Sequence, residues 1–350
     1  MRFNAEDLVR ENIKKLVPYS SARDEFHGIA RVFIDANENS FGSPLTKWYN
    51  RYPDPHQQAV KEKLSQIKGI ETQHIFLGNG SDEVIDILYR AFCEPGKDNV
   101  IICPPTYGMY EVSANINDVQ IKKVQLTKEF QLDLPGIEDA IDANTKIIWL
   151  CSPNNPTANS LNREDIEMIL NNFPGIVAID EAYINFSRQK SFVQELVDYP
   201  NLVVMQTLSK AWGLAALRIG MAFSSESIIA IMNKIKPPYN ISQAAQELAL
   251  TALDEVSQVN DMIVLIVEER NKLAGDLLQR KVVQQVFSSD ANFLLVKVTE
   301  AKEIYDYLLT KGIVVRDRSK VELCEGCLRI TVGTQAENQA LLAALDSFPQ

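Results

Sequence analysis

The stretch Lys146-Ile147-Ile148-Trp149-Leu150-Cys151-Ser152-Pro153-Asn154-Asn155 is an apolar run that ends abruptly in a polar turn containing a proline. The run has no alternating polar face, which is typical of a strand that is covered on both sides. Similar runs occupy residues 74–77, 99–103, 175–180 and 201–206, with helix-like segments between them. This alternation predicts an α/β fold with a parallel or mixed sheet and helices packed on each face.

Polar residues, or residues rich in Gly and Pro, follow these runs directly. Gly78-Asn79-Gly80-Ser81 follows the first run, Pro104-Pro105-Thr106-Tyr107 follows the second, and Asp180-Glu181 closes the fourth. Ligands of open α/β sheets bind at the carboxyl ends of the strands. We therefore expect the chemistry of this protein to lie in these turns.

The pattern changes beyond residue 240. Residues 242–281 predict one kinked helix or two helices. The segments after them predict a strand, a helix, two strands and a final helix, in the order 291–298, 301–311, 313–316, 328–332 and from about 335. A chain of 350 residues usually forms two packed domains. We predict an N-terminal arm, a large domain and a small α+β domain that part of the arm joins, with boundaries 1–30, 31–240 and 241–350.

The composition excludes several classes of protein. The formal net charge of −11 argues against nucleic acid or an anionic membrane as the main partner, because both require a concentrated basic surface. No stretch approaches the ~20 apolar residues that span a bilayer. The N-terminus mixes charges throughout and lacks the apolar core of a signal peptide. We therefore expect a cytoplasmic protein.

The five cysteines indicate reduced, buried thiols, since an odd number scattered over a long chain does not suit a disulfide framework. Cys324 and Cys327 form a C-x-x-C pair. A zinc site would need a second pair of ligands, but His27, His56 and His74 are isolated in the sequence. We expect packing at the C-x-x-C pair and no metal site.

A lysine that follows a buried strand is the first chemical candidate. Thr207-Leu208-Ser209-Lys210 surrounds this lysine with small and hydroxyl residues, and Arg218 follows. An amine held against apolar walls loses part of its preference for the charged form and can then attack an aldehyde. Thr207, Ser209 and Arg218 could hold a phosphate. The alternative is a surface lysine beside a structural arginine.

Three other turns carry candidates. The glycine-preceded helix start at Gly80-Ser81-Asp82 could bind an anion, or it could be a simple helix cap. Asp180 would need a cation at a buried strand end, and Tyr183 could return to the same place; the alternative is a cap and a packing tyrosine. Asn155, and the aromatic ring of Tyr107, complete the set, although each alone would indicate only a turn or a core residue.

The order of these motifs resembles the cofactor site of the fold-type-I aminotransferases that depend on pyridoxal 5′-phosphate (PLP). The similarity spans nearly the whole chain and extends to the histidinol-phosphate aminotransferases of class II. Its supporting segments are residues 18–23, 35–39, 52–55, 80–83 and 327–334. The resemblance implies a large domain with a mixed, mostly parallel sheet, a smaller α+β domain and a homodimer.

The resemblance also implies roles for single residues. Lys210 would hold the cofactor and transfer protons, Asp180 would pair with the pyridine nitrogen, and Tyr183 would act beside them. Asn155 and Tyr183 would contact the ring oxygen, and Tyr107 would stack on the ring. The residues implied to hold the cofactor phosphate are Gly80, Ser81, Asp82 through its N–H, Thr207, Ser209, Arg218 and Tyr52 of the partner subunit.

The implied reaction transfers an amino group between L-histidinol phosphate and 2-oxoglutarate, giving imidazole acetol phosphate and L-glutamate in histidine biosynthesis. The residues implied to bind substrate are Tyr19, Asn37, Arg316 and Arg329. An aromatic amino acid aminotransferase shares the central motifs and remains an alternative. So does a decarboxylase of an amino-acid phosphate on the same scaffold, whereas a non-catalytic PLP-binding regulator would carry a nucleic-acid-binding extension.

Overall fold

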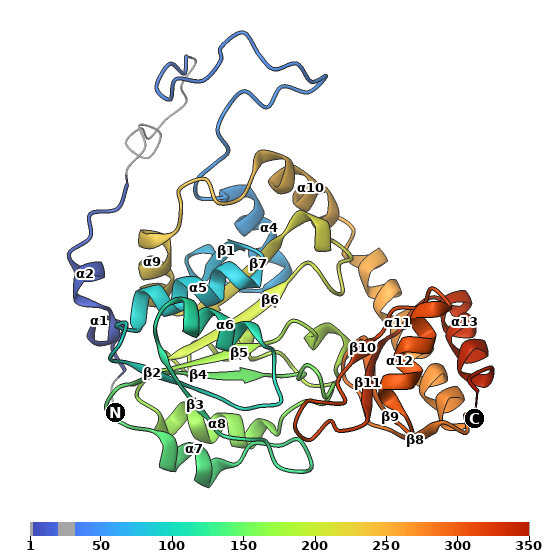
Figure 1. Cartoon of the computed structure of the whole chain (residues 1–350). Helices are drawn as coiled ribbons and strands as arrows, with labels where there is room; N and C mark the ends of the chain where they lie inside the picture. Colours follow the sequence, from blue (N-terminus) through green and yellow to red (C-terminus); the bar gives the residue numbers. More distant parts are fainter. Residues whose placement is uncertain (1–2, 20–31, 350) are drawn as a thin grey trace.

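The computed structural model describes residues 3–19 and 32–349, which form two bodies with separate sheets (Figure 1). The larger body contains seven strands in the order β1-β7-β6-β5-β4-β2-β3. Their bounds, in the same order, are Ile75–Asn79, Ile219–Ser224, Leu202–Thr207, Ile176–Asp180, Thr145–Cys151, Asn99–Ile102 and Gln120–Lys123. All neighbours are parallel except β7, which is antiparallel to both β1 and β6. The predicted α/β class with a mixed, mostly parallel sheet is confirmed.

Helices cover both faces of this sheet, and the strand side chains explain why. In β5, Val177 and Ile179 point into one apolar cluster, while Ile176 and Ala178 point into the other. Because successive side chains of a strand point to opposite faces, a strand buried on both sides must be apolar throughout. The helices on the first face are α4 (Gln58–Lys68), α7 (Leu134–Ala140), α8 (Arg163–Asn172) and α10 (Gln243–Leu253). Those on the second face are α5 (Ser81–Phe92), α6 (Met109–Ile116) and α9 (Glu226–Ile235).

The smaller body is an antiparallel sheet with helices packed against it. Its strand order is β10-β11-β9-β8, with bounds Arg316–Asp317, Cys327–Thr331, Phe293–Val298 and Val283–Val286. Its helices are α11 (Val256–Leu278), α12 (Ala301–Thr310) and α13 (Gln335–Asp346). The two helices α10 and α11 occupy the segment 242–281, where the pattern allowed one kinked helix or two.

The N-terminal residues pack on the large sheet. Helices α1 (Ala5–Leu8) and α2 (Glu11–Lys14) precede the segment that rises away from the body in Figure 1. Ala5 and Val9 are buried in the same apolar cluster as α9. Residues 1–2 and 20–30 of the predicted arm lie outside the described residues, and the domain boundaries 1–30, 31–240 and 241–350 stay a prediction. In the described part of the chain, no helix has both the length and the apolar character that a membrane crossing requires.

Glycines allow the turn after β1 to pack closely against β7. Gly220 of β7 lies opposite Gly78 of β1. A Cβ atom at Gly220 would lie 2.3 Å from the carbonyl carbon of Gly80 and from the backbone nitrogen of Ser81. The Gly80 N–H donates to the Arg218 carbonyl at 2.7 Å, and Gly80 has a φ of +75° that favours glycine. The start of α5 is therefore fixed against the start of β7.

Candidate active site

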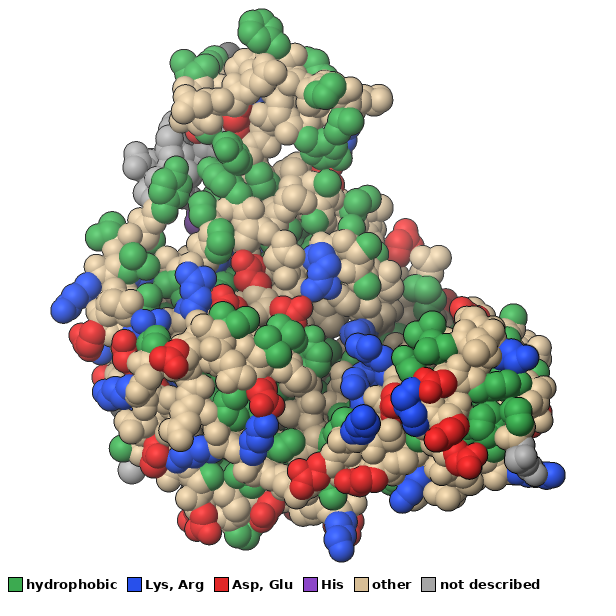
Figure 2. Space-filling view, in the orientation of Figure 1, with side chains coloured by type: hydrophobic (Ala, Val, Ile, Leu, Met, Phe, Trp, Pro, Cys, Tyr) green, Lys and Arg blue, Asp and Glu red, His purple; other side chains and the backbone are tan. Residues whose placement is uncertain are grey.

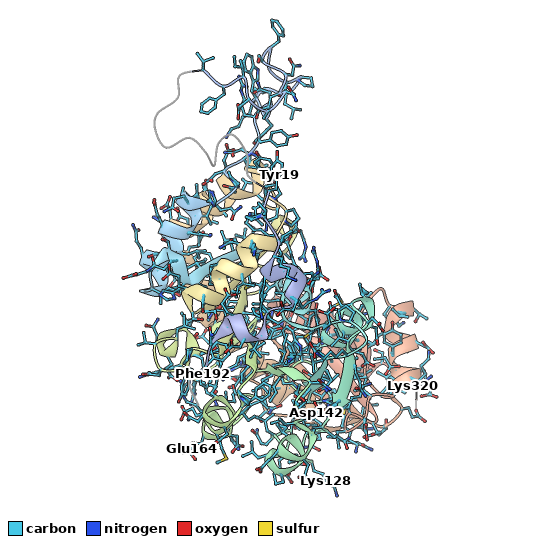
Figure 3. All side chains as sticks on the ribbon, turned by 90° about the vertical axis from the view of Figure 1, so that its left-hand side faces the viewer. Tyr19, Lys128, Asp142, Glu164, Phe192 and Lys320 are labelled. Carbon is cyan, nitrogen blue, oxygen red and sulfur yellow. The ribbon has the colours of Figure 1, made fainter. Side chains whose placement is uncertain are left out.

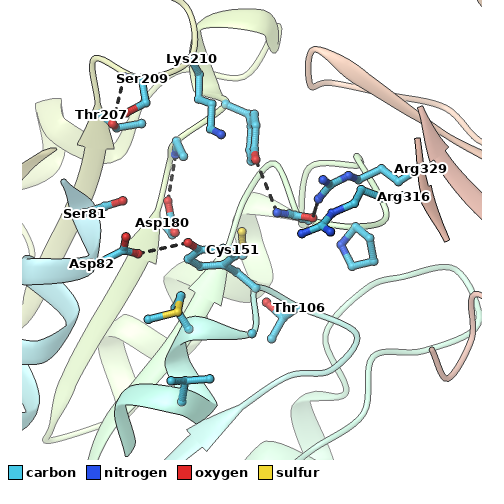
Figure 4. Close-up of a pocket in the computed structure, with 18 of the residues that line it drawn as sticks. Ser81, Asp82, Thr106, Cys151, Asp180, Thr207, Ser209, Lys210, Arg316 and Arg329 are labelled. Atoms are coloured by element: carbon cyan, nitrogen blue, oxygen red, sulfur yellow. Dashed lines mark hydrogen bonds between the residues drawn. The ribbon is translucent and has the colours of Figure 1, made fainter. Parts of the chain in front are cut away.

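The carboxyl ends of β4, β5 and β6 open into a cavity of about 690 Å³ that the start of α5 and the β10–β11 edge also line. Twelve of the residues named from the sequence line this cavity: Ser81, Asp82, Tyr107, Asn155, Asp180, Tyr183, Thr207, Ser209, Lys210, Arg218, Arg316 and Arg329. Ser81, Thr207 and Ser209 lie at one end, Arg316 and Arg329 at the other, and Lys210 and Asp180 between them (Figure 4).

Lys210 extends its amine into the cavity. Its Nζ lies 5.5 Å from the centroid of the Tyr183 ring. Partial burial lowers the pKa of Lys210, and the positive charge of Arg329 lowers it further, while Asp180 opposes this shift. A lowered lysine pKa increases the fraction of neutral amine, which is the form that attacks a carbonyl carbon or accepts a proton.

Asp180 ends β5 with a carboxylate that is almost completely buried. Burial raises the pKa of Asp180, and two hydrogen bonds oppose that rise. The Tyr110 hydroxyl donates to Oδ2 at 2.8 Å, and the Ala182 N–H donates to Oδ1 at 3.0 Å. A buried carboxylate without a cation is costly, so this residue suits a ligand that presents a positive charge.

A chain of polar groups connects the large body to the β10–β11 edge. Arg329 donates from Nη1 to the Asn155 side-chain oxygen at 2.6 Å, and the Asn155 amide donates to the Tyr183 hydroxyl at 3.4 Å. Burial raises the pKa of Tyr183, so its hydroxyl keeps its proton and can act as a donor. Arg329 is therefore connected by hydrogen bonds to the side chains that surround Lys210.

The opposite end of the cavity is formed by the first turn of α5. N–H groups at a helix start have no intrahelical partner and attract anions. The Asp82 carboxylate accepts from the Tyr107 hydroxyl at 3.1 Å and lies 3.3 Å from Nη2 of Arg218. These two partners offset the negative charge that Asp82 would otherwise present to an anion. The Thr207 hydroxyl donates to the Ile219 carbonyl at 3.2 Å and accepts from the Ser209 N–H, which holds this turn in place.

The residues present fit PLP, because each charged part of that molecule meets a group of opposite character. The buried Asp180 carboxylate matches a protonated pyridine nitrogen, and the start of α5 with Arg218 matches a phosphate. Lys210 lies between them, where an aldehyde would be reached (Figure 4).

Three of the residues predicted to act at the site lie elsewhere in this protomer. Asn37 and Tyr52 line a second cavity of about 540 Å³, where the Tyr52 ring stacks on Tyr239 with centroids 4.5 Å apart. Tyr19 is 72% exposed on the N-terminal segment and lies far from Lys128, in the upper part of the view in Figure 3. The roles of these three residues stay predictions.

The cysteines are buried within the described part of the chain. All five are buried free thiols. Burial raises the pKa of Cys324 to about 12 and that of Cys327 to about 11. Among residues 3–19 and 32–349, no three His, Cys, Asp or Glu side chains are grouped so that they could hold a metal ion.

Residues 30–345 match the family model for aminotransferase class I and II. The chain belongs to this aminotransferase family. It is 54% identical to the histidinol-phosphate aminotransferase of Cytophaga hutchinsonii, over 99% of this chain and 100% of the relative. It is 55% identical to that of Parabacteroides distasonis, over 98% of each chain. The crystal structure of the Sinorhizobium meliloti histidinol-phosphate aminotransferase in complex with PLP has the same fold, with a TM-score of 0.79, 23% identity and 89% of each chain covered.

Two residues of this aminotransferase site have no place in the sequence-based prediction. Tyr110, in the first turn of α6, follows Tyr107 by three residues, a short spacing that lets the two rings meet edge-on with centroids 5.6 Å apart. Arg318 follows Arg316 by two residues, a spacing that places both on one face of an extended segment. Both signals exist in the sequence, but each also suits ordinary packing or solvation.

We predict that Tyr110→Phe weakens PLP binding roughly 10-fold or more, because a hydrogen bond to a charged acceptor contributes about 1.5–3 kcal/mol. The loss leaves the Asp180 carboxylate with one donor fewer and raises its pKa further. The measurement is an absorbance titration of the apoprotein with PLP. Tyr89→Phe is the matched control, since its buried hydroxyl donates to the Tyr110 carbonyl and does not reach Asp180. Equal PLP affinity in the two variants would contradict the role of Tyr110.

We predict that Gly220→Ala destabilises the fold by about 1–3 kcal/mol and weakens PLP binding, because the added methyl group displaces the start of α5. Thermal unfolding and the same PLP titration measure the two effects. Gly275→Ala, in α11, is the control. Apart from the backbone of α11 itself, no atom lies within 4 Å of the position that the added methyl group would occupy. If Gly220→Ala behaved like Gly275→Ala, the close approach of β7 and the turn would not control the site.

Proposed function

We propose that this protein is a histidinol-phosphate aminotransferase that transfers an amino group between L-histidinol phosphate and 2-oxoglutarate. The observation that carries the proposal is the cavity that combines Lys210 and Asp180 with arginines at its far end. A lysine and a buried carboxylate suit PLP, and the arginines suit the anionic groups of both substrates. The relatives at about half identity over the whole chain carry this name.

The chain's own residues have distinct tasks in this reaction. PLP, when bound, supplies an electron sink for the charge that develops at the substrate α-carbon. Asp180 would keep the ring nitrogen protonated, and the start of α5 with Arg218 would anchor the phosphate. Lys210 Nζ would remove the proton from the substrate α-carbon as a base and would later give up that proton as an acid. Tyr183 and Asn155 would orient the ring through its oxygen.

The arginines explain how one site accepts two different substrates. A guanidinium group matches a carboxylate and a phosphate alike, since both present paired oxygens to its planar donors. Arg329 is fixed by Asn155 beside the reacting groups and would bind the glutamate α-carboxylate. Arg316 is exposed at the cavity edge and, with Arg329, would meet the phosphate of L-histidinol phosphate.

A homodimer is part of the proposal. Phe41 is 95% exposed, Ile34 86% and Trp48 63% in the segment that rises from the body in Figure 1. Such a group of exposed apolar side chains favours burial against another chain. Tyr52 lies at the base of this segment, and Tyr52 of the partner subunit would complete the phosphate site.

A cytoplasmic location is also part of the proposal, and the reduced, buried cysteines support it.

The assay that tests the proposal follows glutamate formation from L-histidinol phosphate and 2-oxoglutarate by purified, PLP-loaded protein. We expect kcat/KM for L-histidinol phosphate to exceed that for L-phenylalanine by roughly 100-fold, because L-phenylalanine has no phosphate that could bind Arg316. A Lys210→Ala variant should lose multiple turnover. Higher activity on phenylalanine would indicate an aromatic amino acid aminotransferase. Release of CO₂ from an amino-acid phosphate would indicate a decarboxylase.

We predict that Arg316→Ala raises KM for L-histidinol phosphate about 10-fold and changes KM for glutamate less. A phosphate carries up to two charges at neutral pH and gains more from each guanidinium than a carboxylate does. Steady-state kinetics of both half-reactions measure the two constants. Equal losses for the two substrates would show that Arg316 does not select phosphate.

A further inference from the structure

A third arginine lies beside the two that the sequence predicted. In the β10–β11 pair, Arg316 lies directly opposite Arg329. The Arg318 N–H donates to the Cys327 carbonyl at 2.9 Å, which continues the pairing by one step. Residues two apart in an extended strand point to the same face. Arg318 accordingly joins Arg316 and Arg329 in lining the cavity.

Arg316, Arg318 and Arg329 bring their positive charges together at one wall of the cavity. Like charges directly opposite each other destabilise a strand pair. Burial lowers the pKa of Arg318, and the charge of Arg316 lowers it further. Within residues 3–19 and 32–349, no ion pair joins these three arginines to a carboxylate. Asp317, the adjacent acid, accepts from the Ser319 N–H at 2.8 Å.

Arg318 also has an unsatisfied hydrogen-bond donor. Its Nε is buried and has no hydrogen-bond partner among the described residues. Arg329 differs, because its Nη1 already donates to Asn155. Figure 2 shows Lys and Arg side chains gathered where the two bodies meet, on a protein whose formal net charge is −11. A buried, unused guanidinium donor at a cavity wall is costly unless a ligand satisfies it.

We propose that Arg318 is a specificity-determining residue, which binds the phosphate of a dianionic phosphate-ester substrate together with Arg316. The inference rests on the proposed function and names the side chain that distinguishes a phosphate ester from the analogue that lacks the phosphate. Because Arg329 already donates to Asn155, Arg316 and Arg318 supply the two guanidinium groups that balance a dianion. The side-chain carboxylate of glutamate carries one charge and needs only one of them.

The test compares two substrates that differ only in the phosphate. L-histidinol phosphate and L-histidinol are each reacted with PLP-loaded enzyme, and the ratio of their kcat/KM values in the first half-reaction reports the contribution of the phosphate group. Arg318→Gln should lower this ratio about 10-fold or more, through KM for the phosphate ester, with the value for L-histidinol unchanged. Arg318→Lys keeps the charge without the planar fork and should lower the ratio by a smaller factor.

Lys320→Gln is the matched control, because it removes one positive charge from the same loop at an exposed position outside the cavity wall. It should leave the ratio as in the wild-type protein. Equal losses on both substrates in Arg318→Gln and Arg318→Lys, or an unchanged ratio, would overturn the role of Arg318. A wild-type ratio near one would instead reject the proposed function itself, so the two failures are distinguishable.

Discussion

The buried carboxylate of Asp180 is the constraint around which the active site is organised. It lies at the carboxyl end of a strand covered on both faces, where ionisation is opposed by desolvation. The fold holds the charge with one side-chain donor and one backbone donor. Tyr110, the side-chain donor, is itself fixed by stacking on Trp149 with centroids 5.1 Å apart. The electrostatics of the site therefore depend on the packing of the core beneath it.

The charged side chains are unevenly distributed along the cavity. The carboxylates of Asp180 and Asp82 lie toward the α5 end, where Arg218 pairs with Asp82, and three further arginines come from the β10–β11 edge of the smaller body. The hydrogen bond from Arg329 to Asn155 connects the β10–β11 edge to the turn that follows β4. A cofactor with a cationic ring and an anionic phosphate suits the first end, and an anionic substrate suits the second. The meeting of the two bodies thus creates a site that neither sheet forms alone.

The sequence pattern predicts most of the strands that are covered on both faces and misses the polar edge strands. Five of the seven strands of the large sheet correspond to apolar runs, because they are covered on both faces. Strand β3 is an edge strand of the sequence Gln-Ile-Lys-Lys, and β8 contains Gln284 and Gln285, so neither shows an apolar run. Strand β7 (Ile219–Ser224) is not among the predicted strands, because Arg218, the residue before it, is interpreted only as a phosphate ligand. The observed strand β10, at Arg316–Asp317, is shorter than the predicted strand 313–316 and begins later in the chain.

The sequence by itself determined the fold class and the turns that carry the chemistry, because strand burial and strand ends leave local patterns. It also determined the residue types available at those turns, including Lys210 and Asp180. Only the tertiary structure decided that Tyr110 supports Asp180 from 70 residues away and that Arg318 faces the same cavity as Arg329. It also decided that Asn37 and Tyr52 lie in a separate cavity of the protomer. These outcomes depend on contacts between distant segments, and no local spacing in a single sequence records which segments meet.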